Sequence, residues 1–271
     1  MANQTSGAIA LVISDIDGTL ITSNHEVTAA TRATAARLYE NGINLALSSS
    51  RPPRSIRPLA AALNLHSPFA AFNGALIVNA EGEVAARSQI EPEIMARIRA
   101  IAEAHDINVW IYDENDWYAR VRDAFVEREE HTAGFDANLA DYERAAATPA
   151  AKLTVVGKPE FVAIAEREVL AEFPRQVSAS KSKPRFLDVT AFGMHKGAVV
   201  TRLAQTYGVE QSQIAVIGDG PNDIEMFRQA GLSIAMGQAV DEVRNFAKVA
   251  TTSNDDEGWS RGIEKFVLGA S

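Results

Sequence analysis

The chain has 271 residues, 46% of them hydrophobic and 23% charged, which is enough apolar content for one large core or for two domains. Its formal net charge of −9 disfavours binding to nucleic acid, which needs basic surface to displace counterions. The chain has no cysteine, which excludes disulfides, thiolate zinc sites and cysteine nucleophiles.

The first residues, 1–7, lack the basic run that begins a signal peptide. No later apolar segment approaches the length of a membrane span. We therefore expect a cytoplasmic protein without a membrane partner.

The apolar run that starts at Ile9 predicts a buried parallel strand, and it leads directly into Asp15 and Asp17. Ligands of open α/β sheets bind beyond the carboxyl ends of the strands. On an ideal strand the two carboxylates would point to the same side, roughly 6–7 Å apart. Gly18 then permits a backbone turn. This segment predicts a site for a metal ion, a nucleophile and an acid or base.

The rest of the first third alternates helix and strand signals, as parallel βαβ units do. Thr28 is placed to cap a helix and Gly42 to end it. Asn73-Gly74 is a strong turn pair between two short strands. The predicted elements are a helix over 28–39, a strand over 43–47, a helix to about 63, and strands over 69–72, 75–78 and 84–86.

From about Arg87 to 188 the pattern becomes α+β and indicates an inserted domain with an antiparallel sheet. The core domain would then comprise 1–86 and 189–271. Trp110 and Trp117 are expected to pack in the core of the insert. The predicted elements are helices over 92–104, 124–131 and 161–172, and strands over 108–112, 117–121, 152–156, 175–178 and 185–189.

The α/β pattern resumes with a helix over 196–207 that begins at Lys196, and with a strand over 214–217 that leads to Asp219 and Asp223. His195 is expected to have a role at the helix start or on the surface. The last predicted elements are helices over 224–230, 240–246 and 260–268 and strands over 232–235 and 249–251.

Polar side chains thus follow three strands of one predicted sheet and would meet at one edge. Several carboxylates repel one another without a cation between them, and Mg²⁺ prefers oxygen ligands. Lysine, a serine hydroxyl and backbone N–H groups would then bind a phosphoryl group. The converging residues are Asp15, Asp17, Ser49, Lys196, Asp219 and Asp223.

These motifs resemble those of the haloacid dehalogenase (HAD) superfamily, in particular its Cof-type sugar phosphatase branch, subclass IIB. Asp15-Ile-Asp17-Gly-Thr-Leu resembles the first motif, Ser49-Ser50-Arg51-Pro52 the second, Lys196-Gly197 the third and Gly218-Asp219-Gly-Pro-Asn222-Asp223 the fourth. Asn73-Gly74-Ala75 and 253–258 are also similar to features of this branch. One departure is that Ser49-Ser50-Arg51 stands where the branch usually has Thr-Gly-Arg, which keeps the hydroxyl and loses the glycine.

The resemblance implies a Rossmann-like parallel core with an inserted cap of the C2 type. It implies that Asp15 attacks phosphorus to form an aspartyl-phosphate, and that Asp17 protonates the leaving alkoxide and later deprotonates water. Mg²⁺ would be held by Asp15, the backbone carbonyl of Asp17 and Asp219, with Asp223 orienting a metal-bound water or Lys196. The implied phosphate or substrate contacts are Lys196, Ser49, Arg51, Asn73, Gly74 and Asn222.

The resemblance predicts a Mg²⁺-dependent phosphatase of small phosphomonoesters, most simply sugar phosphates, acting as a monomer or homodimer. A phosphohexomutase of the phosphomannomutase type is an alternative, and a noncatalytic phospho-receiver or metabolite sensor is another. Structural interpretations also stay open: Ser49 as a helix N-cap, Asn73-Gly74 as a plain hairpin turn, and Asn254 with Asp255 as caps of the last helix. The sequence does not name the phosphorylated metabolite.

Overall fold

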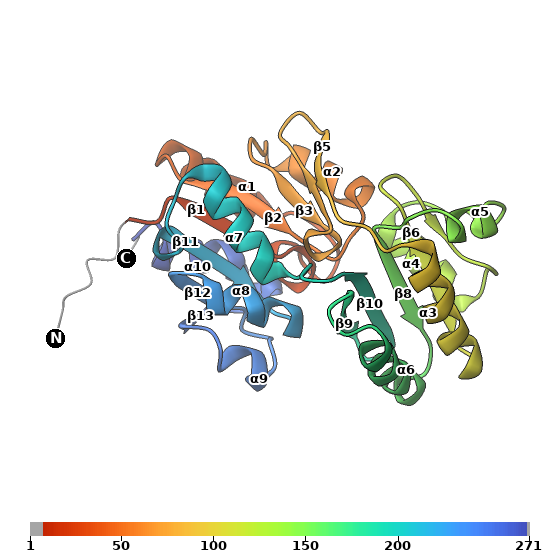
Figure 1. Ribbon diagram of the computed structural model, residues 1–271. Coiled ribbons are helices and arrows are strands. Elements are labelled where there is room, and N and C mark those ends of the chain that lie inside the picture. Colours follow the sequence, from red (N-terminus) through yellow and green to blue (C-terminus); the bar gives the residue numbers. More distant parts are fainter. Residues whose placement is uncertain (1–7, 270–271) are drawn as a thin grey trace.

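The computed structural model describes residues 8–269, and in it the chain folds around two separate β-sheets (Figure 1). The larger sheet has eight strands and the smaller has five. The first seven residues, whose charge pattern was considered above, lie outside the described residues. Among residues 8–269, no helix combines the length and apolar character that crossing a membrane requires.

The larger sheet is a parallel α/β sheet with an antiparallel edge. Its central strand, β1 (Leu11–Ser14), runs parallel to both neighbours, β11 (Ile214–Gly218) and β2 (Asn44–Ser48). All four residues of β1 are buried, as expected for a strand covered on both faces. Beyond β11 follow β12 (Leu232–Ala235) and β13 (Val249–Ala250), and beyond β2 follow β3 (Phe69–Ala71), then antiparallel β4 (Leu76–Val78) and β5 (Val84–Arg87).

Helices cover both faces of this sheet. α1 (Ala29–Glu40) and α10 (Gly258–Phe266) share one hydrophobic cluster with Val12, while α7 (Lys196–Tyr207) and α8 (Ile224–Gln229) share another with Ile13. The predicted cap of α1 is confirmed, because the Thr28 side chain accepts a hydrogen bond from Thr31 N. The remaining helices of this part are α2 (Pro53–Ala62) and α9 (Asp241–Arg244).

The smaller sheet is antiparallel, and we call it with its helices the cap. Its strand order is β7 (Trp117–Tyr118), β6 (Asn108–Tyr112), β8 (Lys152–Val156), β10 (Phe186–Ala191) and β9 (Val177–Lys183). α3 (Pro92–Ala104) and α6 (Pro159–Glu172) pack on its outer face through a separate hydrophobic cluster. α4 (Ala124–Ala133) and α5 (Tyr142–Ala146) complete the cap.

Trp110 and Trp117 are buried in the cap, with ring centroids 5.1 Å apart. They lie on the inner face of the cap sheet, in the same cluster as Phe72 of the larger domain, so their burial depends partly on the contact between the two domains. Two segments connect the domains. β5 belongs to the larger sheet up to Arg87 and β10 belongs to the cap sheet up to Ala191, so we propose that the chain crosses a few residues later than 86 and 188.

Most predicted elements are confirmed, and the differences have local causes. The strand predicted over 117–121 ends at Tyr118, and the one predicted over 175–178 extends to Lys183. β9 is an edge strand that alternates serine and lysine, so it carries little apolar signal. The short helix α5 was not predicted, because one turn is too short for a helical period to show.

Candidate active site

The first aspartates stand beyond the end of β1 and not on it. β1 ends at Ser14, and the turn Ile16–Leu20 follows, in which Gly18 has a φ of +73°. The expectation that Asp15 and Asp17 point to the same side of a strand is therefore wrong, because strand alternation stops before them. A Cβ on Gly18 would lie 2.4 Å from Asp219 Oδ2, so this close approach requires glycine.

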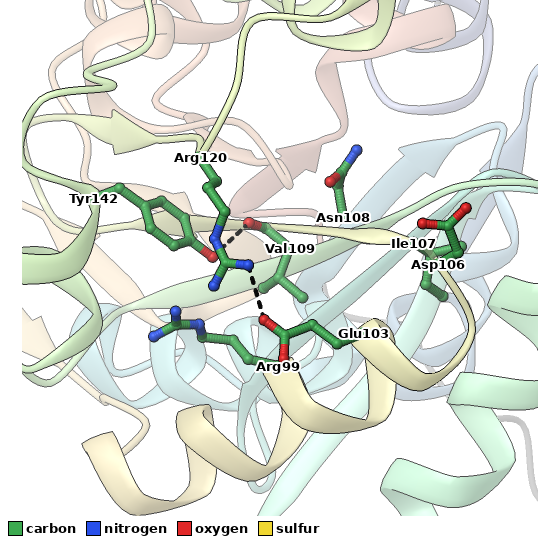
Figure 2. A pocket seen from close by; sticks show the side chains of 8 residues that line it. All are labelled: Arg99, Glu103, Asp106, Ile107, Asn108, Val109, Arg120 and Tyr142. Atoms are coloured by element: carbon green, nitrogen blue, oxygen red, sulfur yellow. Dashed lines mark hydrogen bonds and ion pairs between the residues drawn. The ribbon is translucent and has the colours of Figure 1, made fainter.

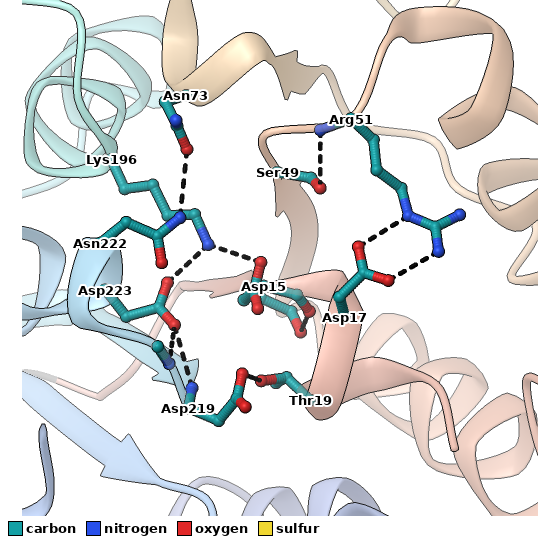
Figure 3. Close-up of polar contacts among 12 residues, drawn as sticks. Asp15, Asp17, Thr19, Ser49, Arg51, Asn73, Lys196, Asp219, Asn222 and Asp223 are labelled. Atoms are coloured by element: carbon teal, nitrogen blue, oxygen red, sulfur yellow. Dashed lines mark hydrogen bonds and ion pairs between the residues drawn. The ribbon is translucent and has the colours of Figure 1, made fainter. Parts of the chain in front are cut away.

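Asp15 is buried and is bound by Lys196, the first residue of α7 (Figure 3). The Lys196 ammonium donates to Asp15 Oδ1 and, at 2.6 Å, to Asp223 Oδ1. His195 caps α7, since its Nδ1 accepts a hydrogen bond from Ala198 N at 3.3 Å, which confirms its expected place at the helix start. The sheet and α7 thus bring a carboxylate and an ammonium 181 residues apart into contact.

The two later aspartates lie where β11 ends. Asp223 Oδ2 accepts hydrogen bonds from the backbone N–H groups of Asp219, at 2.9 Å, and Gly220, at 2.8 Å. Thr19 Oγ1 donates to Asp219 Oδ1 at 3.2 Å. Carboxylate oxygens of Asp15, Asp219 and Asp223 all lie within 4.8 Å of one another, and Lys196 binds two of these three groups, Asp15 and Asp223.

This crowding changes the protonation of the cluster. Burial raises the pKa of Asp15 well above its usual range, and repulsion from Asp223 and Asp219 adds to this although Lys196 opposes it. Burial and the charge of Asp223 raise the pKa of Asp219 to about 6. Burial alone would lower the pKa of Lys196, but Asp15 and Asp223 outweigh it and the pKa is raised. The cluster has more negative charge than Lys196 neutralises.

Asp17 turns away from the other aspartates and forms a two-point ion pair with Arg51. Arg51 Nε donates to Asp17 Oδ2 at 2.7 Å and its Nη2 to Oδ1 at 2.6 Å (Figure 3). Burial alone would raise the pKa of Asp17, but the hydrogen bonds and charge of Arg51 outweigh it and lower the pKa. The Asp17 carboxylate is nevertheless 42% exposed.

Ser49 is buried in the loop after β2. Its Oγ accepts a hydrogen bond from Arg51 N at 3.2 Å, and its carbonyl accepts one from Asn73 N at 2.8 Å. The alternative role of helix N-cap is wrong, because Pro52 holds that position of α2.

Asn73 and Asn222 meet at the site, where Asn222 Nδ2 donates to Asn73 Oδ1 at 3.3 Å. Asn73 is buried and left-handed, with a φ of 55°, in the turn that joins β3 to β4, so the predicted hairpin is confirmed. Gly74 does not join the polar contacts drawn in Figure 3; a Cβ there would lie 2.7 Å from Val199 Cγ2, so it lets the turn pack against α7.

The C-terminal segment also supports the site, and the sequence analysis missed part of this. Trp259 Nε1 donates to Ser14 Oγ at 2.9 Å, and Ser14 Oγ donates to Asp15 O at 2.6 Å. Asn254 Nδ2 donates to Ile21 O at 2.9 Å, and Asp255 Oδ1 accepts from Ser23 N at 2.8 Å. Asn254 and Asp255 therefore hold the loop after Asp17, while Glu257 precedes α10 as its N-cap.

A pocket lies in the cap, and none of the residues of this cluster lines it (Figure 2). It encloses ≈ 170 Å³, and the guanidinium groups of Arg99 and Arg120 lie 5.1 and 5.6 Å from the centre of the Tyr142 ring. Arg120 binds Glu103 at 2.8 Å, and Arg99 binds Glu143 at 3.2 Å. These charges neutralise one another within the cap.

Comparison with known proteins gives a consistent family. Residues 12–263 match the family model of the haloacid dehalogenase-like hydrolases. A Haemophilus influenzae protein whose name classes it as a phosphatase is 31% identical over 256 residues, covering 94% of this chain and 97% of its own. A 5-amino-6-(5-phospho-D-ribitylamino)uracil phosphatase of Bacillus subtilis is 25% identical and covers 96% of each chain.

Solved structures share the whole fold. A haloacid dehalogenase-like hydrolase from Bacteroides thetaiotaomicron superposes with a TM-score of 0.85 at 28% identity, covering 95% of this chain and 99% of its own. A HAD subclass IIB sugar phosphatase superposes with a TM-score of 0.83 at 24% identity, covering 94% and 98%, and this likeness concerns the fold. The parallel core and the antiparallel cap are thus both present in these structures.

Proposed function

The chain belongs to the haloacid dehalogenase-like hydrolases and is a phosphatase of that family, and from this premise we propose that it hydrolyses small sugar phosphates with Mg²⁺ and through an aspartyl-phosphate on Asp15. The observation that carries the proposal is the contact of the buried Asp15 with Lys196, beside the carboxylates of Asp219 and Asp223. A noncatalytic receiver is not in keeping with the hydrolase family or with a cap over this cluster.

The donor set fits a hard divalent cation. Three carboxylates lie close together and Lys196 binds two of them, and carboxylate oxygen is the ligand type that Mg²⁺ prefers. Both oxygens of Asp223 already accept hydrogen bonds, from Lys196 and from the backbone of Asp219 and Gly220. We therefore propose Asp15, Asp219 and the Asp17 carbonyl as ligands, and Asp223 as the residue that orients Lys196 and the loop. Bound Mg²⁺ would neutralise charge on the transferring phosphoryl group.

The reaction would proceed in two displacements at phosphorus. An Asp15 carboxylate oxygen forms a bond to phosphorus as the bond to the substrate alkoxide breaks, and Asp17 gives its proton to that alkoxide. Asp17 then takes a proton from a water molecule whose oxygen attacks phosphorus, which releases inorganic phosphate and frees Asp15. Lys196 and the Ser49 hydroxyl would bind the phosphoryl oxygens.

In this scheme the ion pair between Arg51 and Asp17 has to break before the first displacement. The two-point ion pair favours the ionised form of Asp17, whereas the first displacement needs its protonated form. We propose that the substrate phosphoryl group draws Arg51 toward itself and frees Asp17 to carry the proton. In its paired, ionised form Asp17 suits the second displacement, in which it acts as a base.

Substitution of the nucleophile tests the proposal. Asp15→Asn should abolish phosphate release from p-nitrophenyl phosphate while the circular dichroism spectrum stays that of the wild type. Asp241→Asn, a change at an exposed ion pair of α9, is the matched control and should keep full activity. Turnover by Asp15→Asn at the wild-type rate would exclude the aspartyl-phosphate mechanism. A wild-type enzyme indifferent to chelation by EDTA would exclude the metal requirement.

A further inference from the structure

The inner face of the cap sheet carries a row of polar and aromatic side chains that the reaction scheme does not use. Thr154 of β8 pairs in register with Trp110 of β6 and with Asp188 of β10, so these three side chains share one face. Lys152 lies two residues from Thr154 on the same face. The opposite face, which includes Leu153 and Leu187, packs on α3 and α6.

The two strands that flank β10, which are β8 and β9, both contact loops of the site. From β8, Lys152 Nζ donates to Ser50 O at 3.1 Å, in the loop that carries Ser49 and Arg51. On the other side, β9 lies against the turn Pro221–Asp223, which carries Asn222. β10 runs between β8 and β9, so Asp188, on the same face as Lys152, belongs to the part of the cap sheet between these two contacts.

Asp188 is buried, yet only one of its carboxylate oxygens is used. Oδ1 accepts a hydrogen bond from Thr154 Oγ1 at 2.8 Å and lies 3.2 Å from Lys152 Nζ. Oδ2 is shielded from solvent and has no hydrogen-bond partner within residues 8–269. A buried carboxylate oxygen without a donor is costly, so the site has a vacant acceptor.

Lys152 contacts the other oxygen of this carboxylate, Oδ1. Its ammonium donates to Ser50 O, lies 3.2 Å from Asp188 Oδ1 and lies 4.3 Å from the centre of the Tyr112 ring. The lysine orients Asp188 through Oδ1 and links the cap to the Ser49–Arg51 loop. A donor on a bound molecule would therefore satisfy Oδ2.

We propose that Asp188 is a specificity-determining residue, whose free oxygen accepts a hydrogen bond from a hydroxyl or N–H group on the alcohol portion of the substrate. The inference rests on the proposed phosphatase function and narrows it to phosphomonoesters whose alcohol bears such a donor. An alcohol without one would leave Oδ2 unpaired as the cap closes. We therefore expect a higher kcat/KM for phosphomonoesters whose alcohol bears a hydroxyl or N–H donor.

Asp188→Asn tests the proposal, because the amide can keep an acceptor for Thr154 and Lys152 while a donor replaces Oδ2. With glucose 6-phosphate or ribitol 5-phosphate, kcat/KM should fall by about tenfold or more, the effect of one lost hydrogen bond. With p-nitrophenyl phosphate and cyclohexylmethyl phosphate, whose alcohols bear no donor, kcat/KM should change less than about twofold. Thr154→Ser, the matched control, perturbs the same row but keeps the hydroxyl that binds Asp188, and it should affect both substrate groups alike.

Three results would overturn the inference. One is an equal loss on both substrate groups in Asp188→Asn, which would show a purely structural role. Another is no loss on either group. The third is a wild-type enzyme that turns over the donor-free esters as well as every hydroxyl-bearing ester, which would leave the phosphatase proposal intact.

Binding separates failure of the inference from failure of the proposed function. If the wild type hydrolyses no phosphomonoester, calorimetry with the Asp15→Asn protein measures the affinity for ribitol 5-phosphate and cyclohexylmethyl phosphate directly. Tighter binding of the ribitol ester, lost in the Asp15→Asn/Asp188→Asn protein, would support the inference without catalysis. Equal affinity for the two esters would refute it.

Discussion

Arg51 binds both oxygens of the Asp17 carboxylate, at 2.7 Å through Nε and 2.6 Å through Nη2. The pair joins the loop after β2 to the turn after β1, and it lowers the pKa of Asp17 although burial alone would raise it. The proposed acid and base is thus held in its ionised form while no substrate is bound. Because Asp17 titrates, this ion pair should make both the stability of the fold and the rate of the reaction depend on pH.

Arg51→Gln should therefore reduce stability in a pH-dependent way. Because the pKa of Asp17 is lower in the folded than in the unfolded chain, the pair stabilises the fold above the unfolded pKa of about 4 and ceases to do so as pH falls through the folded pKa. The melting temperature of the variant should lie below that of the wild type at pH 6, and the gap should close toward pH 3. A gap that stays constant with pH would show that Arg51 acts through packing.

The same variant should shift the kinetic pH profile. Without Arg51 the pKa of Asp17 rises, so the protonated form persists to higher pH. The alkaline limb of kcat against pH for an alkyl ester such as glucose 6-phosphate, whose leaving alkoxide needs a proton, should move to higher pH than in the wild type. Arg51→Lys, which keeps the charge and loses the two-point geometry, should give an intermediate position.

Gly18→Ala and Gly42→Ala form a matched pair. Both glycines have positive φ, +73° and +72°, so either substitution should cost about 1 kcal/mol of unfolding free energy. Only the Cβ at Gly18 meets a neighbour, Asp219 Oδ2 at 2.4 Å, whereas nothing lies within 4 Å at Gly42. Gly18→Ala should raise the Mg²⁺ concentration for half-maximal activity, and Gly42→Ala should leave it unchanged. An equal effect of both variants would contradict a role for this close approach.

Trp259→Phe should destabilise the chain, because it removes the indole N–H donor and leaves a void where the larger ring was buried. The indole donates to Ser14 Oγ, which in turn donates to Asp15 O, and both residues are buried. We expect a loss of about 1–2 kcal/mol in unfolding by urea, since a buried acceptor loses its donor. In a double-mutant cycle with Ser14→Ala the two losses should not add, because they remove the same bond. Additive losses would show that the hydrogen bond between Trp259 and Ser14 does not contribute to stability.

Mg²⁺ should stabilise the folded protein without any substrate. At a free concentration of about one hundred times its dissociation constant, a ligand that binds only the folded state adds about 2.7 kcal/mol. Thermal unfolding at neutral pH should show an upward shift of the melting temperature with Mg²⁺, reversed by EDTA. Asp219→Asn should abolish the shift, and Asp241→Asn should keep it. A shift of equal size in the Asp219→Asn protein would place the ion elsewhere.

Elements with strong local signals could be predicted residue by residue. The helices over 92–104 and 196–207 and the strands over 108–112 and 152–156 have the predicted bounds, because capping residues and apolar periodicity act within a few residues. β9 was predicted too short, since an exposed edge strand needs few apolar side chains. The meeting of Asp15, Lys196, Asp219 and Asp223 could also be predicted, because the carboxyl ends of parallel strands share one edge.

Which side chains pair with one another could be learned only from the tertiary structure. Asp17 stands two residues from Asp15, yet it pairs with Arg51, because β1 ends at Ser14 and the turn redirects it. Lys152 reaches Ser50 across 102 residues, and Asp188 lies between the two strands that contact the site loops because β10 runs between β8 and β9. The sequence alone determined the family, the reaction class and the order of the motifs, since these depend on residue types at short spacing. The tertiary structure decided which side chains face one another, because strand order and turn geometry arise from contacts between distant segments.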